Sequence, residues 1–518
     1  MRLRNLAGST PAQSSSPLPG VKRLSRATLN EVKPKVRRPR YDPAALSCGI
    51  LHLGCGAFHR AHQAFATQRA IEAQGEEGLR WGIAAASMTR MTVPGQLQPQ
   101  DGLYTLLERS AAGTRAEIIG TLREVIHAPT DPKPLPQRIA DPQTRIVTLT
   151  ITPPGYLLEP ASGRLQKDHL DVLHDLRHPA HPRSAIGAIA YGLRKVRDAG
   201  TVPPVIISCD NVSDNGRTLR RAVANFAAMR DDTLASWIDA NVCFPNTMVD
   251  RIVPAATSAD REDAERLLGL YDAAPVSMEP YIQWVIEEFD GPRPLWEAAG
   301  AQFVRDVRPF ELAKLRLLNG THMLLAYLGA LAGYKTIAET VADPLFAELA
   351  EAFMLREQGA TLDMAPDRLR AYVADLMARL RNPAIRHDVS RIGRNGSAKF
   401  ATRLMRPLRE NLQEGRSGPC TILVAAAWIR WFTQHETKGP QVLLIDQKKD
   451  EMKRLCAAAG GDPMVLARSF LGLEEVFGPK LPNHEAVVEE LARDLHDLAT
   501  LPVREVVRDR LAELLAAG

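Results

Sequence analysis

The sequence predicts an α/β domain with a doubly wound, mostly parallel sheet, followed by an all-α domain. Apolar runs of strand length at 49–53, 81–86, 145–151 and 205–208 alternate with helical stretches at 58–74, 184–199 and 218–240. Such alternation is typical of a parallel sheet with helices on both faces. After about residue 300 the strand signals fade and helical periodicity continues to the C-terminus, which predicts the second domain.

The second domain is expected to consist of helices alone. Candidate helices lie at 307–331, 336–356, 366–380, 398–414, 418–434 and 463–475, with one or two more between 484 and 516. These patterns place the α/β domain at 26–303 and the helical domain at 304–518. A basic leader at 1–25 precedes them.

Composition excludes two classes of partner. The chain has 518 residues, 45% hydrophobic and 24% charged, as in soluble globular proteins. No apolar run approaches the ~18 residues of a membrane-spanning helix. Residues 1–40 hold ten basic residues and one acidic residue. The leader, with Ser-Ser-Ser at 14–16 and scattered proline, is predicted to be disordered to about residue 25. It faintly resembles a transit peptide, but a plain extension is the favoured interpretation. The rest of the chain is mildly acidic, which argues against nucleic-acid binding.

The cysteines and histidines argue against a metal centre. Six cysteines are scattered along the chain without a Cys-x-x-Cys pair, so we expect neither a disulfide framework nor a thiolate zinc site, and a cytoplasmic location. His59 and His62 have the spacing of a metal pair, but ordinary polar contacts are the commoner role of such a pair. We therefore predict no metal.

A glycine turn follows the first predicted strand. Gly54 and Gly56 flank Cys55 just before a helix, where glycine allows a dinucleotide pyrophosphate to approach the backbone. This favours a Rossmann-type dinucleotide-binding domain, although the third small residue of the full fingerprint is absent. Arg60 could add charge beside a phosphate. Residues 86–92, after the second strand, contain one arginine and no acid, which leaves room for a 2′-phosphate, so NADP stays open beside NAD.

Residues 314–322 place three chemically capable side chains in an apolar run. At about 100° per residue, Lys314, His322 and Asn319 fall at roughly 0°, 80° and 140° around a helix. One wedge could therefore direct an amine, an imidazole and an amide toward one cavity. The alternative is an amphipathic helix with these polar residues in solvent.

Several further motifs follow one another along the chain. They are His-Leu-Gly-Cys-Gly-Ala-Phe-His-Arg-Ala-His-Gln at 52–63, Gln-Asp-Gly-Leu-Tyr-Thr-Leu at 100–106, Ser-Cys-Asp-Asn at 208–211, Phe-Pro-Asn-Thr-Met-Val-Asp-Arg-Ile-Val-Pro at 244–254, Glu-Pro at 279–280, Gln-Trp-Val-Ile-Glu at 283–287, the segment 314–322 and Gly-Ser-Ala-Lys-Phe at 396–400. In these motifs and their order the chain resembles the mannitol dehydrogenase family of polyol-specific long-chain dehydrogenases. The resemblance runs from about residue 25 to the C-terminus.

The resemblance implies a zinc-independent, nicotinamide-dependent enzyme that is monomeric or loosely associated. It would interconvert a polyol or sugar acid with its ketose or keto acid. The matching residues are Lys314 as general acid/base, Asn211 and Asn319 as the oxyanion-stabilising pair, and His322 as a substrate ligand. Val249, Asp250, Arg391 and Lys399 would line the substrate pocket, Glu311 would act as proton gate, and Gly54, Gly56, Phe58 and Arg60 would bind cofactor.

One departure from the family pattern lies near residue 153, where Pro153 replaces the usual glutamate. Mannitol–fructose and mannonate–fructuronate chemistry both stay open, and arabinitol is a third substrate. Two other classes also remain. A non-catalytic nicotinamide-nucleotide sensor would not need Lys314 with both asparagines, and a metal-dependent hydrolase would use His59 and His62.

Overall fold

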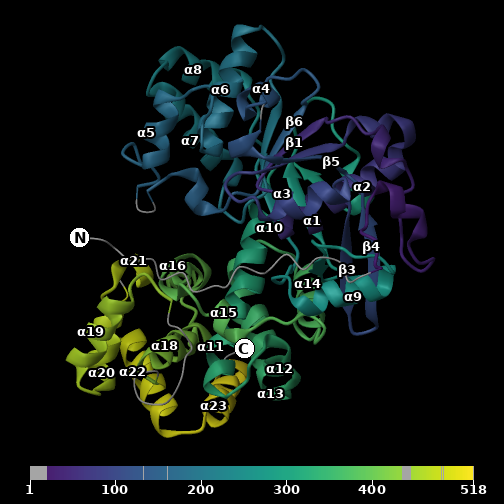
Figure 1. The fold of residues 1–518 in the computed structure, drawn as a ribbon. Helices are drawn as coiled ribbons and strands as arrows, with labels where there is room; N and C mark the ends of the chain where they lie inside the picture. The colour runs from purple at the N-terminus through teal and green to yellow at the C-terminus, as the bar shows by residue number, and fades with distance from the viewer. Residues whose placement is uncertain are drawn as a thin grey trace, which may run out of the picture. The chain divides into compact units, whose positions relative to one another are not determined.

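The chain forms two compact units, Met1–Val307 and Arg308–Gly518. The computed structural model describes residues 20–131, 133–159, 162–434, 445–479, 481 and 484–516. The first unit contains a parallel sheet with helices, and the second is built from helices (Figure 1). Within the described ranges, no helix is long and apolar enough to cross a membrane. The predicted fold class is confirmed.

The first unit is organised around a five-stranded sheet in which every strand is parallel to its neighbours. In spatial order the strands are β5 (Leu122–His127), β2 (Ile83–Ser87), β1 (Ile50–Leu53), β6 (Ile146–Leu149) and β7 (Val205–Ser208). Ile50 of β1 lies beside Ile83 on one side and Ile146 on the other. The chain therefore proceeds outward from β1 in both directions, which is the doubly wound topology.

Helices cover both faces of this sheet because alternate strand residues point to opposite sides. Leu51 and Leu53 of β1 pack in one core with α4 (Leu135–Ile139), α6 (Ala185–Asp198) and α7 (Asn215–Ala228). Ile50 packs in another core with α2 (Gln63–Gln74) on the opposite face (Figure 1). The unit's other α-helices are α1 (Ala57–Ala61), α3 (Thr92–Leu97), α5 (Leu170–Arg177), α8 (Asp232–Asn241) and α9 (Ser258–Leu268).

Two small sheets in this unit were not apparent from the sequence. β3 (Tyr104–Ser110) and β4 (Gly113–Ile119) form an antiparallel hairpin that β9 (Val276–Met278) extends. β8 (Thr247–Asp250), β10 (Gln283–Glu287) and β11 (Gln302–Val304) form the other. The single helix expected at 218–240 is instead the pair α7 and α8. Asp231 starts α8 by accepting a hydrogen bond from the Leu234 backbone N–H at 3.0 Å.

The last residues of the expected leader are ordered. Leu24 is fully buried, and its backbone N–H donates to the Tyr271 carbonyl at 2.9 Å. The prediction of disorder is therefore wrong for residues 20–25, because an apolar side chain and a strand-like contact hold them to the unit. Residues 1–19 lie outside the described residues.

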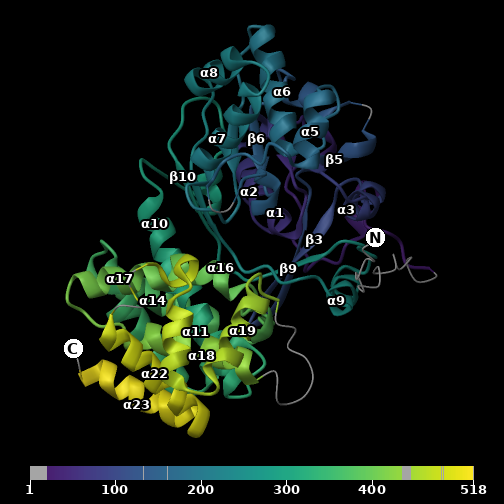
Figure 2. The same ribbon diagram turned by 90° about the vertical axis from the view of Figure 1, so that its left-hand side faces the viewer.

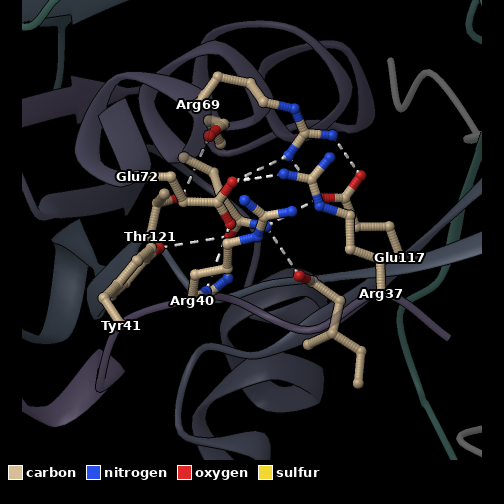
Figure 3. Close-up of polar contacts among 11 residues, drawn as sticks. Arg37, Arg40, Tyr41, Arg69, Glu72, Glu117 and Thr121 are labelled. Atoms are coloured by element: carbon tan, nitrogen blue, oxygen red, sulfur yellow. Dashed lines mark hydrogen bonds and ion pairs between the residues drawn. The ribbon is translucent and has the colours of Figure 1, made fainter. Parts of the chain in front are cut away.

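An ion-pair network holds the next segment against α2 and β4. Arg37 pairs with Glu72 at 2.5 Å and with Glu117 at 3.5 Å. Arg69 of α2 donates two hydrogen bonds to Glu117, at 2.5 and 2.6 Å (Figure 3). Two guanidinium groups thus share two carboxylates, and the bidentate geometry makes Glu117 the junction between the segment, the helix and the strand.

The second unit packs its helices around one hydrophobic core. Its α-helices are α10 (Arg308–Ala313), α11 (Gly320–Leu331), α12 (Ile337–Ala342), α13 (Pro344–Ala352), α14 (Pro366–Leu380), α15 (Val389–Ile392), α16 (Gly396–Phe400), α17 (Arg406–Gln413), α18 (Pro419–Gln434), α19 (Lys449–Ala459), α20 (Pro463–Leu471), α21 (Glu474–Phe477), α22 (Glu485–Thr500) and α23 (Val503–Ala516). Figure 2 shows α11 and α18 side by side within this unit, and both contribute to the core. Trp428 of α18 is fully buried there.

Short π-helical segments lie within or at the end of three of the expected continuous helices. They are η8 (Lys314–Asn319), η9 (Phe353–Gln358) and η11 (Ala401–Met405). The expected helix 307–331 is α10, η8 and α11 in succession, and 398–414 is α16, η11 and α17. A periodicity of 3.6 residues cannot reveal such segments, because the pattern on either side stays helical.

Candidate functional site

A pocket of about 660 Å³ opens beside the carboxyl ends of strands in the central sheet. Its lining includes Gly54 to Gly56 after β1, Ser87 to Arg90 after β2, Thr150 and Ile151 after β6, and Ser184 and Ala185 at the start of α6. The strand order reverses between β1 and β6, and doubly wound sheets bind their ligands at this position.

The glycine turn has a backbone that other residues would not tolerate at Gly54. Its φ is 104°, and a Cβ there would lie 2.2 Å from the carbonyl oxygen of Thr150. Gly56 is different, because a Cβ there would meet no protein atom closer than the Gly54 oxygen at 3.8 Å. The protein leaves open space above Gly56, and that space fits the close backbone approach of a pyrophosphate.

A buried histidine supports this turn. His52 Nε2 lies 3.0 Å from the Gly54 carbonyl oxygen, and Thr150 Oγ1 donates to the same oxygen at 2.7 Å. Burial lowers the pKa of His52 to about 3. The ring is therefore neutral at ordinary pH and positions the turn without adding charge to it.

The structure does not bring Phe58 or Arg60 to the lining of this pocket. Phe58 stacks on His62 with ring centroids 5.0 Å apart. Arg60 is only 6% exposed and donates to the carbonyls of Ala274 at 2.5 Å and Gly56 at 3.3 Å. Arg60 therefore supports the glycine turn from within the unit, because its guanidinium group is committed to backbone oxygens.

The two histidines considered for a metal have separate partners. The ring of His59 stacks on His52 with centroids 3.3 Å apart, and His62 Nε2 lies 3.0 Å from the Gln283 carbonyl oxygen. The described part of the chain holds no group of three or more His, Cys, Asp or Glu side chains placed to bind a metal ion.

The loop after β7 carries Asn211 and is fixed by its neighbour. Asp210 accepts hydrogen bonds from the backbone amides of Ile151 at 3.0 Å and Thr152 at 2.8 Å, and from the Tyr156 hydroxyl at 3.0 Å. Tyr156 closes the turn that contains Pro153. The Asn211 side chain is exposed beyond this anchored carboxylate.

Val249 and Asp250 end β8 and are both buried. Asn215 connects β7 to β8, because its side-chain N–H donates to the Ser208 carbonyl at 3.2 Å and to the Thr247 carbonyl at 3.0 Å. The loop with Asn211 and the strand with Val249 and Asp250 are therefore joined by hydrogen bonds within the first unit.

In the second unit, Lys314 and Asn319 lie on the π-helical segment η8. The Gly320 N–H donates to the carbonyl five residues earlier, at Leu315. A π-helical segment turns less per residue than an α-helix, so the ~140° separation that an α-helix would give Lys314 and Asn319 does not hold. The predicted angles are corrected here, and π-helical segments are frequent at functional sites. Lys314 is 8% exposed, so it does not project into solvent as the amphipathic interpretation required.

His322 follows on α11 and is 7% exposed. Its Nε2 is buried and has no hydrogen-bond partner among the described residues. Burial lowers its pKa well below the usual range, and nearby His387, Arg379, Arg403 and Lys314 lower it further. A neutral imidazole with an unused ring nitrogen is suited to accept or donate a hydrogen bond to a substrate hydroxyl.

The other expected residues of this unit occupy different environments. Lys399 Nζ donates to the Ile392 carbonyl at 2.9 Å and to the Arg394 carbonyl, and burial lowers its pKa to about 8. Arg391 is exposed on α15. Burial is the main cause that lowers the pKa of His387, and the charge of Arg391 lowers this pKa further. Glu311 lies on α10, three residues before Lys314, and is half-buried.

No pattern in the sequence marks Asp210 as the anchor of the Asn211 loop or identifies the basic residues around His322. Arg379, His387 and Arg403 occupy helical or loop stretches in which charged residues are usually solvated. Only their three-dimensional proximity to His322 identifies them.

A doubly wound α/β unit with a glycine turn at its switch point is the architecture of a dinucleotide-binding protein. The family model of the mannitol dehydrogenase Rossmann domain matches residues 48–298, and that of the mannitol dehydrogenase C-terminal domain matches residues 306–499. The chain belongs to the mannitol dehydrogenase family, and the resemblance drawn from its motifs is confirmed.

Relatives of this chain include enzymes named for two kinds of substrate. The D-mannonate oxidoreductase of Escherichia coli is 41% identical over 91% of this chain and 97% of that protein. A mannitol 2-dehydrogenase of Aspergillus fumigatus is 35% identical over 90% of this chain and 93% of that protein. The solved Pseudomonas fluorescens mannitol 2-dehydrogenase, in a ternary complex with NAD and D-mannitol, is 34% identical with a TM-score of 0.83. The comparison covers 96% of this chain and all of that one.

Proposed function

We propose that this chain is a metal-independent, nicotinamide-dependent oxidoreductase that interconverts a polyol or hexonate with its ketose or keto acid. The observation that carries the proposal is Lys314, a lysine only 8% exposed on a π-helical segment that also bears Asn319. Burial of an amine favours its neutral form, which is the form that can accept a proton.

The proposed chemistry gives a role to each residue expected from the motifs. When bound, the nicotinamide supplies the hydride acceptor. Lys314 accepts the hydroxyl proton of the substrate, and Glu311 passes that proton to solvent. The amides of Asn211 and Asn319 donate hydrogen bonds to the developing alkoxide, and such donors contribute several kcal/mol, on the order of 3, in a water-poor site.

Substrate recognition is assigned to side chains of matching chemistry. His322, Arg391 and Lys399 offer donors to hydroxyl or carboxylate oxygens, and Asp250 accepts from hydroxyl groups. Val249 supplies an apolar wall. In this proposal residues 26–303 bind the cofactor and residues 304–518 supply the base.

For the cofactor we propose NAD, with NADP accepted. The pocket and glycine turn support dinucleotide binding at Gly54 and Gly56, where Arg60 holds the Gly56 carbonyl and Phe58 follows on α1. The stretch Ser87 to Arg90 lines the pocket beyond β2 and contains no carboxylate to hold a ribose 2′-hydroxyl. Arg90 supplies a positive charge there instead. Replacing it, as Arg90→Ala, should lower kcat/KM with NADPH more than with NADH.

The decisive experiment is a panel of reductions followed by loss of reduced-nicotinamide absorbance. Fructose, fructuronate, xylulose and tagaturonate are each combined with NADH and with NADPH. Turnover of at least one keto substrate is expected, and turnover of xylulose alone would assign the chain to arabinitol. Tight NADH binding without turnover of any of them would favour the nucleotide sensor. Loss of activity in EDTA would contradict the metal-independent chemistry.

Two further expectations concern the protein in the cell. All six cysteines are free, which supports our proposal of a reducing, cytoplasmic location. We also propose a monomer or a weak oligomer that requires neither nucleic acid nor a membrane.

A further inference from the structure

Arg403 is a partly buried residue whose guanidinium group has no counter-ion among the described residues. It lies on η11, and no residue in the described part of the chain accepts a hydrogen bond from it or forms an ion pair with it. Burial lowers its pKa to about 10, and the Tyr327 phenol is the neighbour that opposes this effect. A partly buried guanidinium group without a protein partner is available to an anionic ligand.

The position of Arg403 connects it to the proposed base. Its carbonyl oxygen lies 3.5 Å from the place that a Cβ on Gly320 would occupy. Gly320 directly follows Asn319, and η11 packs against η8, which carries Lys314. The segment that bears Arg403 therefore backs directly onto the segment that bears the proposed catalytic groups.

Two guanidinium groups, those of Arg379 and Arg403, act electrostatically on His322. Lys314 and the ring of His387, whose pKa burial lowers to about 4, are also among its neighbours. The ring of His387 lies 4.7 Å from that of His322. Asp388 acts electrostatically on His387, but it accepts a hydrogen bond from Arg386. Asp446 acts on Lys399, but it accepts a hydrogen bond from the Ser397 backbone N–H.

We propose that Arg403 binds the carboxylate of a polyhydroxy acid, so that the preferred substrate pair is a hexonate and its keto acid. The inference rests on the proposed function and restricts its preferred substrates from polyols and hexonates to hexonates. A neutral polyol would leave the guanidinium group without an anionic partner, whereas a terminal carboxylate can accept two parallel N–H bonds from it.

Fructuronate and fructose form a matched pair for testing this assignment. They differ in carrying a carboxylate or a hydroxymethyl group at the end of the chain remote from the ketone. Arg403→Gln removes the charge and keeps hydrogen-bonding capacity. Arg406→Gln is the control, because Arg406 lies three residues further along, is exposed and pairs with Glu410 at 3.1 Å.

The wild-type protein should reduce fructuronate with a higher kcat/KM than fructose. Arg403→Gln should lower kcat/KM for fructuronate by about 10- to 100-fold and for fructose by less than about 3-fold. Arg403→Lys should recover part of the loss, and Arg406→Gln should behave as wild type. The ratio between the two substrates within one preparation does not depend on the folded fraction.

Equal losses for both substrates, or faster reduction of fructose by the wild type, would overturn the assignment. Calorimetric titration of the NADH-loaded protein with mannonate and mannitol separates this inference from the proposed function. Tighter mannonate binding that Arg403→Gln abolishes supports the carboxylate site even if no substrate turns over. Equal binding of the two ligands by the wild type rejects the site even if turnover is observed.

Discussion

Asp210 accepts a hydrogen bond from the backbone N–H of Thr152 at 2.8 Å, and Thr152 has a φ of 64°. Few non-glycine residues adopt this left-handed conformation, so the carboxylate stabilises a turn that would otherwise relax. Because Asn211 follows Asp210 in the chain, the same contact fixes the loop that carries a proposed oxyanion donor.

Asp210→Asn should therefore impair catalysis without altering its chemistry. The amide has one acceptor oxygen in place of two, so a backbone N–H at Ile151 or Thr152 loses its partner, at a cost of about 1–3 kcal/mol. Displacement of Asn211 should lower kcat by about 10- to 100-fold.

Steady-state kinetics measures the loss of kcat in Asp210→Asn, and urea unfolding measures its loss of stability. Asp214→Asn, which alters an exposed ion pair with Arg217 in the same loop, is the control. Wild-type kcat in Asp210→Asn would refute the positioning role.

Two glycine replacements should separate folding from cofactor binding. Gly54→Ala places a Cβ 2.2 Å from the Thr150 oxygen, so we expect lower stability and weaker NADH binding. Gly56→Ala meets no close protein atom, so the variant should melt like wild type yet bind NADH at least about 10-fold more weakly. Thermal melts and fluorescence titration measure these quantities. If Gly56→Ala bound NADH as tightly as wild type, the pyrophosphate would not approach this turn.

Glu357 should give the stability of the protein a specific pH dependence. Burial raises the pKa of Glu357 from 4.5 to about 7, although the backbone amides of Cys420 and Thr421 donate to it. The folded state therefore holds this proton more tightly than the unfolded state. This tighter binding contributes to the free energy of unfolding. The contribution is fully present below pH 4.5 and is lost as the pH rises through about 7.

Glu357→Gln should remove this loss. The amide keeps an acceptor oxygen and does not titrate, so its free energy of unfolding should decline less than that of wild type over the same pH window. Chemical denaturation of the full chain at several pH values gives the two curves. Glu351→Gln, at an exposed position on α13, serves as the control. Parallel curves for wild type and Glu357→Gln would mean that Glu357 does not titrate in this range.

Glu117→Gln should destabilise the first unit by about 1–3 kcal/mol, because Arg37 and Arg69 lose the charge that they share. Glu124→Gln removes a carboxylate that is 44% exposed and pairs with Arg138, and should cost less than about 1 kcal/mol. Urea unfolding compares the two variants. An equal cost for both would show that the network in Figure 3 contributes no more than a surface ion pair.

The fold class was predictable because uninterrupted apolar strands such as Ile50–Leu53 alternate with helices. The hairpin β3–β4 escaped prediction, since Glu108 and Arg109 interrupt its apolar pattern. Gly54 was identified from its motif, whereas the support from His52 required the three-dimensional structure. The π-helical turn at Lys314 and the unpaired charge of Arg403 were not predictable, because helical periodicity records neither an extra residue per turn nor the absence of a partner.

Turnover of Lys314→Ala, with the keto substrate that the wild type reduces best, tests the central claim most directly. Lys335→Ala removes an exposed amine from the same unit and is the control. We predict that Lys314→Ala lowers kcat by about 10³-fold or more, as loss of the acid/base group requires, while the NADH dissociation constant stays within about 2-fold of wild type. Wild-type turnover by Lys314→Ala would contradict the account.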